Sequence, residues 1–487
     1  MDIRHKMWIR SWPVVAGLMI LTGCVKNPVT GGRQLALISE SQEIEIGQAS
    51  HPEILSEFGA VEDPALQEYF SRIGLELAKI SHRPDLPWKF TVLDTDVVNA
   101  FAVPGGYVYF TRGILAHMNN EAELAGVLGH EIGHITARHS VTQMSQQQLF
   151  GLGLGVGSIL SPTFRQLGGL AETGVGIFLL KYSRDHERQS DQLGVQYSEL
   201  AGYDPEQMSR FFEVFVNMRE EEGEAIPNWL SSHPAPPDRI QATEAAAIRA
   251  KSANPGRQYK INGQEFLTRL SGVIYGENPR EGFVEGGRFV HPELRFQLDV
   301  PQGWQVQNSK SVVVFAEPQR SAVVQLTLVP SEEGQSPEAI GRNIGQKEGI
   351  QLVDGATATV NGNQAYLGRY RVQTEQGILG VAAAFIRYGG LVYQITGLTP
   401  EDGFSRFSGT FGSSLRSFRE LSDSRILQVQ PDRLRIHRSR AGESLRSIAG
   451  TTKNSRITLE ELVRLNRLDP DQQLAPGTLV KLVQPGR

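Results

Sequence analysis

The segment GHEIGH, residues 129–134, places two histidines and a glutamate within little more than one helical turn. Around it, EAELAGVLGHEIGHITARHS contains no proline, and its apolar residues recur at helical spacing. His130 and His134 are then four residues apart on one face of a helix. Two neutral imidazoles in this arrangement can bind one Zn²⁺, and Glu131 beside them can act as a general base. The spacing predicts hydrolytic zinc chemistry, with ordinary polar residues on a helix as the alternative.

A catalytic zinc site needs a third protein ligand and one open position. The segment KYSRDHERQSDQLG supplies Glu187, with Asp191 one helical turn later on the same face. Glu187 can complete the coordination, and Asp191 can accept the outer N–H of a ligand histidine and so fix its tautomer. His139 and His186 are the competing ligands. We expect both at the surface, because His139 lies nine residues beyond His130 and His186 points about 100° away from Glu187.

Four motifs of the chain resemble those of the HtpX and BepA-like zinc metallopeptidases, which are gluzincins related to the CAAX prenyl protease. In chain order the motifs are NAFAVPGGYVYFTRGIL, H-E-x-x-H, Y-S-R-x-x-E-x-x-x-D and SSHPAPPDRI, and they lie within residues 35–245. The resemblance implies one zinc ion per chain. The residues it assigns are the zinc ligands His130, His134 and Glu187, the catalytic base Glu131, and Asp191 beside the ligands.

The same resemblance gives roles to two further segments. Residues 99–112 resemble the family's active-site edge strand, onto which an extended substrate peptide can add through main-chain hydrogen bonds. A simple core hairpin is the alternative. The residues concerned are Asn99, Ala100, Phe101, Gly105 and Gly106. His233, in SSHPAPPDRI, matches a histidine that in BepA-like members occupies the fourth zinc position, so we expect it to act as a plug that keeps the enzyme latent.

The expected reaction is metal-assisted hydrolysis of a peptide bond. Zinc lowers the pKa of its water and polarises the scissile carbonyl, while Glu131 takes the proton of the water and passes it to the leaving amine. The candidates for stabilising the oxyanion are Arg184, Arg239 and a displaced His233. We expect loose, main-chain-directed specificity that suits exposed, unfolded segments.

Cys24 is the only cysteine, and it follows Leu21-Thr22-Gly23. Upstream, a short basic segment precedes the apolar run PVVAGLMIL, which is too short to span a membrane and is typical of an export signal. The sequence LTGC resembles the lipobox of bacterial lipoproteins, in which the cysteine becomes the acylated first residue. Because residue 25 is valine rather than aspartate, we expect a lipid anchor in the outer membrane of a Gram-negative cell, facing the periplasm. A buried core cysteine is the alternative.

The patterns of apolar residues predict a multidomain chain: a mainly helical domain with a small β-sheet, then an α+β domain, then a small domain of order strand, helix, helix, strand. The resemblance described above implies that the first of these is a zincin-like metallopeptidase domain. The α+β domain resembles the PsbP/Mog1 type, and we expect helices to cover one face of its sheet. The predicted segments are a signal peptide (1–23), a tether (24–39), a zinc metallopeptidase domain (40–250), a linker (251–285), the α+β domain (286–420), a second linker (421–432) and the C-terminal domain (433–487).

The C-terminal domain resembles a LysM module. The residues that carry the resemblance are Gly442 to Leu445, Ile448, Ala449, Leu462, Asn466, Pro476 and Gly477. LysM modules bind N-acetylglucosamine polymers, so the resemblance implies contact with peptidoglycan. The first strand departs from the usual pattern because it is rich in arginine, and a small basic domain without a ligand is the alternative.

Charge and glycine are unevenly distributed along the chain. The net charge is −5, but residues 433–487 hold 11 Lys and Arg against 5 Asp and Glu, so the rest of the chain is acidic. We expect no nucleic-acid partner. Two apolar, glycine-rich stretches, 149–160 and 167–180, are each too short to span a membrane. We expect them to form helices or a flap beside the active site that can touch the membrane, with a transmembrane pair as the alternative.

An anchor facing the periplasm, a latent peptidase and a wall-binding tail together suggest quality control of the cell envelope. The expected substrates are unfolded or misassembled periplasmic and outer-membrane proteins. Two rival functions stay open on the sequence alone. One is a non-catalytic chaperone or scaffold in which zinc only holds the fold together, and the other is a peptidoglycan hydrolase.

Overall fold

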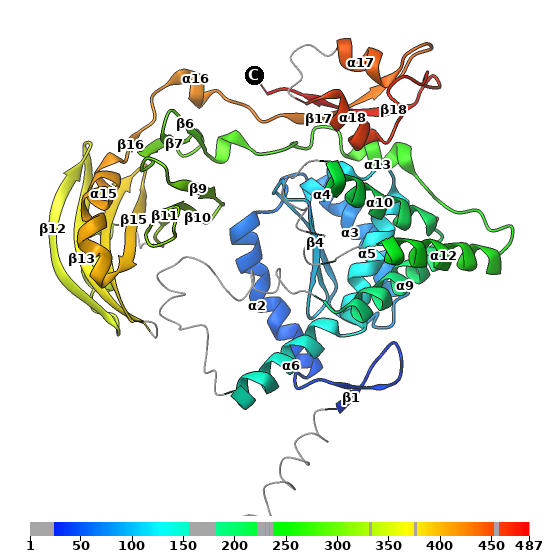
Figure 1. Ribbon diagram of the computed structural model, residues 1–487, viewed down its shortest axis with the longest axis horizontal. Helices are drawn as coiled ribbons and strands as arrows, with labels where there is room; N and C mark the ends of the chain where they lie inside the picture. Colours follow the sequence, from blue (N-terminus) through cyan, green and yellow to red (C-terminus); the bar gives the residue numbers. More distant parts are fainter. Residues whose placement is uncertain are drawn as a thin grey trace, which may run out of the picture.

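A computed structural model describes most of the chain after the predicted signal peptide (Figure 1). The described residues are 24–154, 182–221, 229, 233, 237–330, 334–374, 377–451 and 457–486. The predicted signal peptide and most of the two glycine-rich stretches lie outside them. A largely helical part, a sheet-rich part and a small C-terminal part are distinct in Figure 1, which confirms a multidomain chain. Within the described residues, no helix is both long enough and apolar enough to cross a membrane.

The helical part consists of long helices around one large apolar core. Its helices are α2 (Glu40–Phe58), α3 (Pro64–Lys79), α4 (Arg112–His117), α5 (Glu121–Thr136), α6 (His139–Leu154), α9 (Arg184–Leu200), α10 (Glu206–Glu221) and α12 (Pro237–Ala253). Every residue of α5 is buried, so this helix lies at the centre of the domain. The Asn120 side chain accepts the amide of Glu123 and caps its first turn.

Two glycines allow α5 and α9 to pack closely. A Cβ atom placed on Gly129 would lie 3.0 Å from Cα of Gly194, and one on Gly133 would lie 3.1 Å from Cβ of Leu193. Larger side chains at these two positions would push the helices apart, because packed interiors leave no spare volume. The close approach brings the first turn of α9 beside the histidines of α5.

The small sheet of this part has three strands, β3 (Lys89–Leu93), β4 (Ala100–Val103) and β5 (Tyr107–Thr111), in the order β3-β5-β4. The predicted small β-sheet is therefore present, and β3 pairs with β5 in parallel. Within the described residues, β4 pairs only with β5 and lies at the edge of the sheet. The turn between β4 and β5 uses Gly105 and Gly106, whose φ angles of 87° and 101° favour glycine.

The segment predicted as a tether is packed against the helical part. It contains a hairpin of β1 (Cys24–Lys26) and β2 (Arg33–Leu35). The side chain of Asn27 donates to the carbonyl of Ala137 at 3.2 Å, and Ile38 is buried in an apolar cluster with Val141. The start of the described chain is thus tied to the turn that follows α5.

The segment 251–285, predicted as a linker, is more than a connection. It holds α13 (Gly263–Arg269), a 3₁₀ turn η1 (Pro279–Glu281) and strand β6 (Phe283–Glu285). Phe266, Leu270 and Val273 belong to the core of the helical part. The prediction missed this helix because Asn254, Pro255 and Gly256 suggested a flexible connection, whereas the apolar residues beyond them pack inward.

The sheet-rich part contains a seven-stranded antiparallel sheet of order β12-β13-β14-β15-β11-β10-β9 beside a four-stranded sheet of order β16-β8-β7-β6. The bounds are β7 (Arg288–His291), β8 (Phe296–Asp299), β9 (Gln305–Asn308), β10 (Val312–Ala316), β11 (Val323–Leu328), β12 (Ile350–Val360), β13 (Asn363–Thr374), β14 (Gly377–Tyr388), β15 (Leu391–Pro400) and β16 (Arg419–Glu420). Helix α15 (Phe404–Ser417) packs on β14 and β15.

Helices contact both faces of the large sheet, not one face as the sequence suggested. Successive residues of β14 point to opposite sides: Ala384 packs in one apolar cluster with Phe411 of α15, whereas Phe385 packs in another with Ile340 of α14 (Pro337–Ile344). Apolar residues therefore occupy both phases of this strand, which is typical of a strand buried on both sides.

The C-terminal part has the predicted order of strand, helix, helix, strand. Its elements are β17 (Arg433–Arg438), α17 (Leu445–Thr451), α18 (Leu459–Asn466) and β18 (Leu479–Gln484), with β17 antiparallel to β18; a short helix α16 (Ser424–Leu427) precedes them. Val480 and Leu482 pack under α17 and α18, whereas Leu434 and Val483 belong to the core of the helical part. The two-stranded sheet thus lies between its own helices and the helical domain. Its assignment as LysM stays a prediction.

Candidate metal centre

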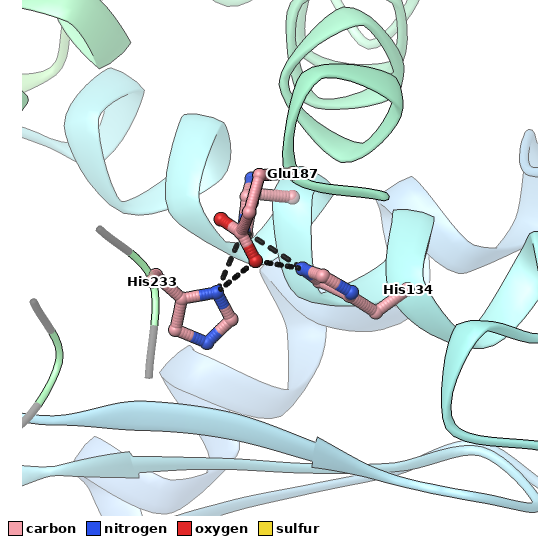
Figure 2. Close-up of side chains that lie close together, drawn as sticks. His134, Glu187 and His233 are labelled. Atoms are coloured by element: carbon pink, nitrogen blue, oxygen red, sulfur yellow. Dashed lines mark hydrogen bonds and ion pairs between the residues drawn. The ribbon is translucent and has the colours of Figure 1, made fainter. Parts of the chain in front are cut away.

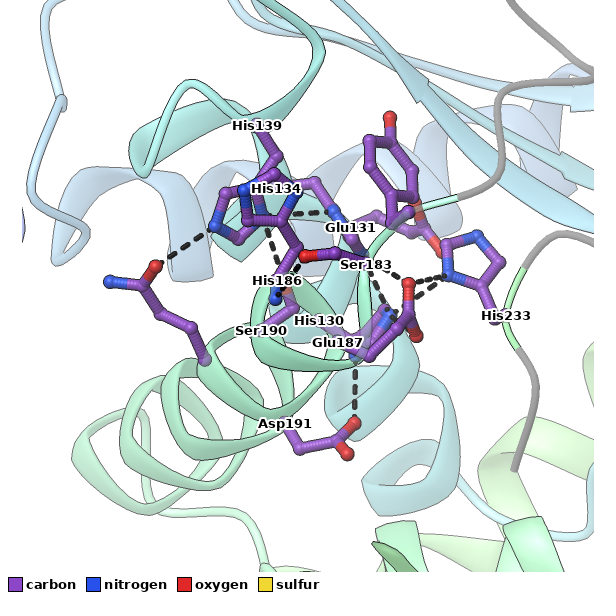
Figure 3. A network of polar contacts seen from close by, with 12 residues as sticks. His130, Glu131, His134, His139, Ser183, His186, Glu187, Ser190, Asp191 and His233 are labelled. Atoms are coloured by element: carbon purple, nitrogen blue, oxygen red, sulfur yellow. Dashed lines mark hydrogen bonds and ion pairs between the residues drawn. The ribbon is translucent and has the colours of Figure 1, made fainter. Parts of the chain in front are cut away.

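His130, Glu131 and His134 lie on α5 and are fully buried. Their spacing places both imidazoles on the face that meets α9 (Figure 3). The Nε2 atoms of His130 and His134 lie 3.0 Å apart. The convergence that the sequence predicted for the two histidines is present.

Glu187, in the first turn of α9, points its carboxylate at the same position (Figure 2). Its Oε1 lies 3.5 Å from Nε2 of His134, and its Oε2 lies 3.7 Å from Nε2 of His130. A third imidazole completes the group, because Nδ1 of His233 is 3.0 Å from Oε1 of Glu187 and 3.3 Å from Nε2 of His130. Donor atoms of these four residues all lie within 4.8 Å of one another.

The donor set fits zinc. Four ligands about 2.1 Å from one ion in a tetrahedron are about 3.3 to 3.5 Å from one another, close to the separations observed here. Several imidazole nitrogens and a carboxylate that face one buried point are poorly paired with each other, whereas a divalent cation can satisfy them together. His130, His134 and Glu187 are the residues that would hold the ion. Their roles as ligands stay a proposal.

Glu131 is placed as a general base would be. Its side chain is fully buried, and neither carboxylate oxygen has a hydrogen-bond partner within the described part of the chain. The nearest cationic candidate is His233, whose Nε2 lies 3.7 Å from Oε1 of Glu131. A buried carboxylate without a partner is costly. A water molecule or a substrate at the centre would remove that cost.

Asp191 lies one turn after Glu187 and supports His130. Its Oδ1 is 2.9 Å from Nδ1 of His130, the nitrogen that points away from the centre. The contact matches the role expected for Asp191. Burial alone would raise the pKa of this carboxyl, but the Arg239 guanidinium and the contact with His130 lower it to about 2. Asp191 is therefore ionised and can hold the Nδ1–H tautomer of His130.

Arg239 takes part in the site in a way that sequence reasoning did not find. From the first turn of α12 it donates to both oxygens of Asp191 and lies 2.7 Å from Oε2 of Glu187. Its guanidinium thus pairs with two carboxylates. Arg184, the other arginine suggested for stabilising the oxyanion, is exposed. The only hint in the sequence was the position of Arg239 six residues after His233 in SSHPAPPDRI.

Electrostatics favour a neutral His134, a more readily protonated His233 and an ionised Glu187 at this centre. Burial, reinforced by the neighbouring histidines, holds the pKa of His134 well below its usual value. Burial would raise the pKa of Glu187, but His233 and Arg239 lower it. For His233, burial would lower the pKa, yet the carboxylates of Glu187 and Glu131 raise it. Neutral imidazole and ionised carboxylate are the forms that bind a metal.

His139 corrects a prediction. We expected it at the surface, but it is 2% exposed, and its Nδ1 lies 3.1 Å from Nδ1 of His134. The prediction assumed that the helix continues through residue 139. Instead α5 ends at Thr136, and Arg138 adopts a left-handed conformation with φ of 60° that turns the chain back toward α5. His186 is half-buried and stacks on His139 with ring centroids 4.2 Å apart.

Aromatic side chains that the sequence did not indicate pack beside the centre. Trp229 is fully buried, stacks on His233 with ring centroids 5.3 Å apart, and contacts Phe212 of α10. Its backbone N–H donates to the carbonyl of Val98 at 3.2 Å, just before the predicted substrate strand. The tyrosine Tyr182 packs against His134, with its hydroxyl bonded to Ser140.

Comparisons with known proteins place this centre in a family. The model of peptidase family M48 matches residues 64–247. The metalloprotease YcaL of Escherichia coli strain K12 is 31% identical over 183 residues, which cover 35% of this chain and 68% of YcaL. The chain belongs to peptidase family M48. This membership confirms the expected relationship to BepA-like zinc metallopeptidases and, with the buried donor group, zinc as the cofactor.

Further M48 relatives share the same region. The beta-barrel assembly-enhancing protease of Escherichia coli strain K12 is 28% identical over 222 residues, 44% of this chain and 45% of that protein. The mitochondrial metalloendopeptidase OMA1 of Arabidopsis thaliana is 31% identical over 173 residues, 35% of this chain and 34% of that protein. This M48 chain therefore spans about half or less of the length of those two relatives.

One further similarity is to a solved structure. The solution structure of cyanobacterial PsbP (CyanoP) from Synechocystis sp. PCC 6803 aligns with a TM-score of 0.24 and 19% identity, covering 28% of this chain and 98% of CyanoP.

Proposed function

We propose that the protein is a zinc-dependent endopeptidase of the cell envelope that hydrolyses unfolded or misassembled periplasmic and outer-membrane proteins. One observation carries the catalytic part: the Glu131 carboxylate is buried, has no hydrogen-bond partner within the described residues, and lies 3.7 Å from the ring of His233, which belongs to the group formed with His130, His134 and Glu187. Structural zinc sites need no such base. Membership in family M48 supports the reaction class.

The chain's own residues divide the work of the reaction. Bound zinc would supply Lewis-acid polarisation of the scissile carbonyl and a more acidic water. Glu131 would accept the proton of the attacking water and deliver it to the leaving amine. Asp191 and Arg239 would keep His130 and Glu187 in place during this transfer. The apolar surroundings exclude bulk water and so strengthen the local electrostatic interactions.

The edge strand β4 is the proposed docking site for substrate. In the part of the chain that the structure describes, one edge of β4 has no neighbouring strand, and β4 packs against α5. An extended peptide could add there through main-chain hydrogen bonds, with little demand on its side chains. Binding of this type favours unfolded segments, because folded proteins rarely expose a free strand of suitable length.

His233 supports a latent resting state. It contacts Glu187 and approaches Glu131, so it occupies the space in which water and the substrate carbonyl would meet. We propose that this histidine must leave before hydrolysis. Arg239, only a few residues after His233, fixes the start of α12 through its ion pair with Asp191. The residue that anchors this helix is therefore not the residue that plugs the centre.

Three features support the proposed cellular setting. The LTGC segment supports a lipid anchor at Cys24, and the basic C-terminal domain supports contact with peptidoglycan through its LysM-like pattern. The name of one Escherichia coli relative, beta-barrel assembly-enhancing protease, refers to assembly of β-barrels, which agrees with envelope proteins as substrates. These three features together favour quality control in the periplasm.

A non-catalytic scaffold is the second candidate, and one observation favours it. With His233 in place the site offers four protein donors, the closed arrangement of structural zinc sites. Glu131→Gln separates the two functions, because it preserves shape and ligands but removes the base. We expect the variant to lose at least about a hundredfold in proteolysis of an unfolded protein while it keeps its zinc.

The matched control is Glu68→Gln, which makes the same change at an exposed position of α3. It should cleave at the rate of the wild-type protein. If Glu131→Gln degraded the substrate as fast as Glu68→Gln, the peptidase proposal would be wrong and the scaffold would be favoured. Release of muropeptides from purified sacculi that depends on Glu131 would instead favour a peptidoglycan hydrolase.

A further inference from the structure

His139 lies directly behind one of the two metal-facing histidines. Its Nδ1 is 3.1 Å from Nδ1 of His134, the nitrogen on the side of that ring that points away from the centre (Figure 3). On its other side, Nε2 of His139 is 2.9 Å from Oε1 of Gln189. Ser190 also lies near, with its hydroxyl 3.3 Å from Nδ1 of His139. His139 is thus held between His134 and helix α9.

These contacts determine which ring nitrogens of His139 and His134 carry a proton. A carbonyl oxygen of an amide only accepts hydrogen bonds, so Nε2 of His139 must carry the proton that it shares with Gln189. In a neutral ring, Nδ1 of His139 is then an acceptor. Nδ1 of His134 must therefore be the donor in the contact between the rings, which leaves Nε2 of His134 with its lone pair directed at the centre.

We propose that His139 is a positioning residue that locks His134 in its metal-binding tautomer and orientation, with Gln189 fixing the tautomer of His139 in turn. The inference rests on the zinc site proposed above but concerns residues that do not touch the metal. His139 cannot itself be a ligand in this arrangement. It contacts His134 through the ring edge opposite to the nitrogen that faces the centre.

The turn between α5 and α6 is built to place His139 there. Arg138 has φ of 60°, a left-handed conformation that is unfavourable for a residue other than glycine. Its side chain compensates by donating to Glu43 at 3.1 Å and to the carbonyl of Ile38 at 2.8 Å. Asn27 holds the carbonyl of Ala137. Three contacts from the N-terminal segment and α2 therefore hold the turn that aims His139 at His134.

The two metal-facing histidines are supported in different ways, and the charges of the site explain the difference. His130 contacts the carboxylate of Asp191, whereas His134 contacts a neutral imidazole. The centre already holds the carboxylates of Glu131, Glu187 and Asp191, with Arg239 as the cation bonded to two of them. A further carboxylate behind His134 would add buried negative charge without a cation to match it. An imidazole fixes the tautomer without that cost.

The test measures the zinc affinity of three variants, two at His139 and one at His186. His139→Phe keeps a ring of similar size but offers no acceptor to His134. His139→Asn places an amide oxygen near the position of Nδ1, so it restores the acceptor. His186→Phe is the control, since His186 stacks on His139 and its ring makes no described hydrogen bond to a proposed ligand. All are measured as full-length protein in competition with a chromogenic chelator.

We expect His139→Phe to bind zinc about ten- to a hundredfold more weakly than the wild-type protein, the usual effect of losing a group that orients a ligand. His139→Asn and His186→Phe should stay within about threefold of the wild-type value. Equal affinity of His139→Phe and wild-type protein would overturn the proposal. So would an His139→Asn variant as weak as His139→Phe, because packing alone would then explain the loss.

A measurement on the unaltered protein covers the case in which His139→Phe does not fold. Long-range ¹H–¹⁵N correlation of the zinc-loaded protein distinguishes the two imidazole tautomers. We expect His139 with its proton on Nε2 and His134 with its proton on Nδ1. A proton on Nδ1 of His139 would contradict the proposal. Neither measurement depends on proteolysis. A failed peptidase assay would therefore contradict the proposed function without contradicting this inference.

Discussion

Nε2 of His233 lies 3.7 Å from Oε1 of Glu131, while Nδ1 of the same ring lies 3.0 Å from Oε1 of Glu187. One imidazole therefore stands between the proposed base and a proposed ligand. A substrate carbonyl and its attacking water need this space. Under the proposed function, this relationship makes His233 the residue that would separate a resting form from a working form.

Removal of this imidazole should raise activity. In His233→Ala the centre keeps three donors and gains an open position. If the blocked form makes up nine-tenths or more of the molecules, kcat/KM for an unfolded protein should rise about tenfold or more. His437→Ala, a change of the same type in the C-terminal domain, should leave the rate unchanged. A lower kcat in His233→Ala at normal zinc content would contradict the plug and would favour His233 as an oxyanion-stabilising group.

The C-terminal domain should stabilise the peptidase domain through one ion pair. Arg467 lies 2.6 Å from Glu123, which is 1% exposed in the first turn of α5. Removal of a partner from a buried pair leaves an unpaired charge. We expect Arg467→Met to lower the free energy of unfolding by about 2 to 4 kcal/mol, measured by urea denaturation.

Two controls define this result. Arg446 pairs with Asp471 on the surface of the same domain, with side chains 57% and 67% exposed. Arg446→Met should therefore cost about 0.5 kcal/mol or less. The double variant Glu123→Gln and Arg467→Met should recover part of the loss, because it no longer buries a lone carboxylate. Equal effects of the two single arginine variants would show that the domains are not coupled in this way.

Acid should destabilise the same interface through His117. Burial, with Lys481 and Arg467 nearby, lowers the pKa of this histidine to about 3. The unfolded chain, with an ordinary pKa near 6.5, binds a proton at a higher pH than the folded protein does. The free energy of unfolding should therefore fall as the pH drops from about 6.5 toward 3, with a slope from this residue of up to about 1.4 kcal/mol per pH unit. His117→Phe should remove that part of the slope, and an unchanged slope in the variant would exclude His117 as its source.

The sequence was sufficient where local spacing determines geometry. Two histidines four residues apart on an uninterrupted helix must share a face, so the donor pair followed directly from the motif. Glu187 and Asp191 followed in the same way from the pattern of α9. The edge position of β4 came from resemblance, and the sheet order agrees with it.

Features that depend on long-range contacts could not be predicted from the sequence. His139 was misplaced because the left-handed turn at Arg138 has no glycine or proline to mark it, and contacts from distant residues stabilise it. The sequence held one indication of a buried contact that was not used, because Lys481 lies inside the apolar run LVKLV. Its Nζ donates to the carbonyls of Ala116 and Met118 at 2.6 and 2.9 Å, in the interface with the helical domain. Only tertiary structure shows which face of the small sheet is covered.

The central claim is that His130, His134 and Glu187 hold one zinc ion beside Glu131. Anomalous diffraction at the zinc edge, on crystals of the purified protein, tests this claim most directly. We expect a single peak about 2.0 to 2.2 Å from Nε2 of both histidines and from a carboxylate oxygen of Glu187. A zinc-loaded protein with its anomalous peak elsewhere, or with no peak among these three side chains, would contradict the account.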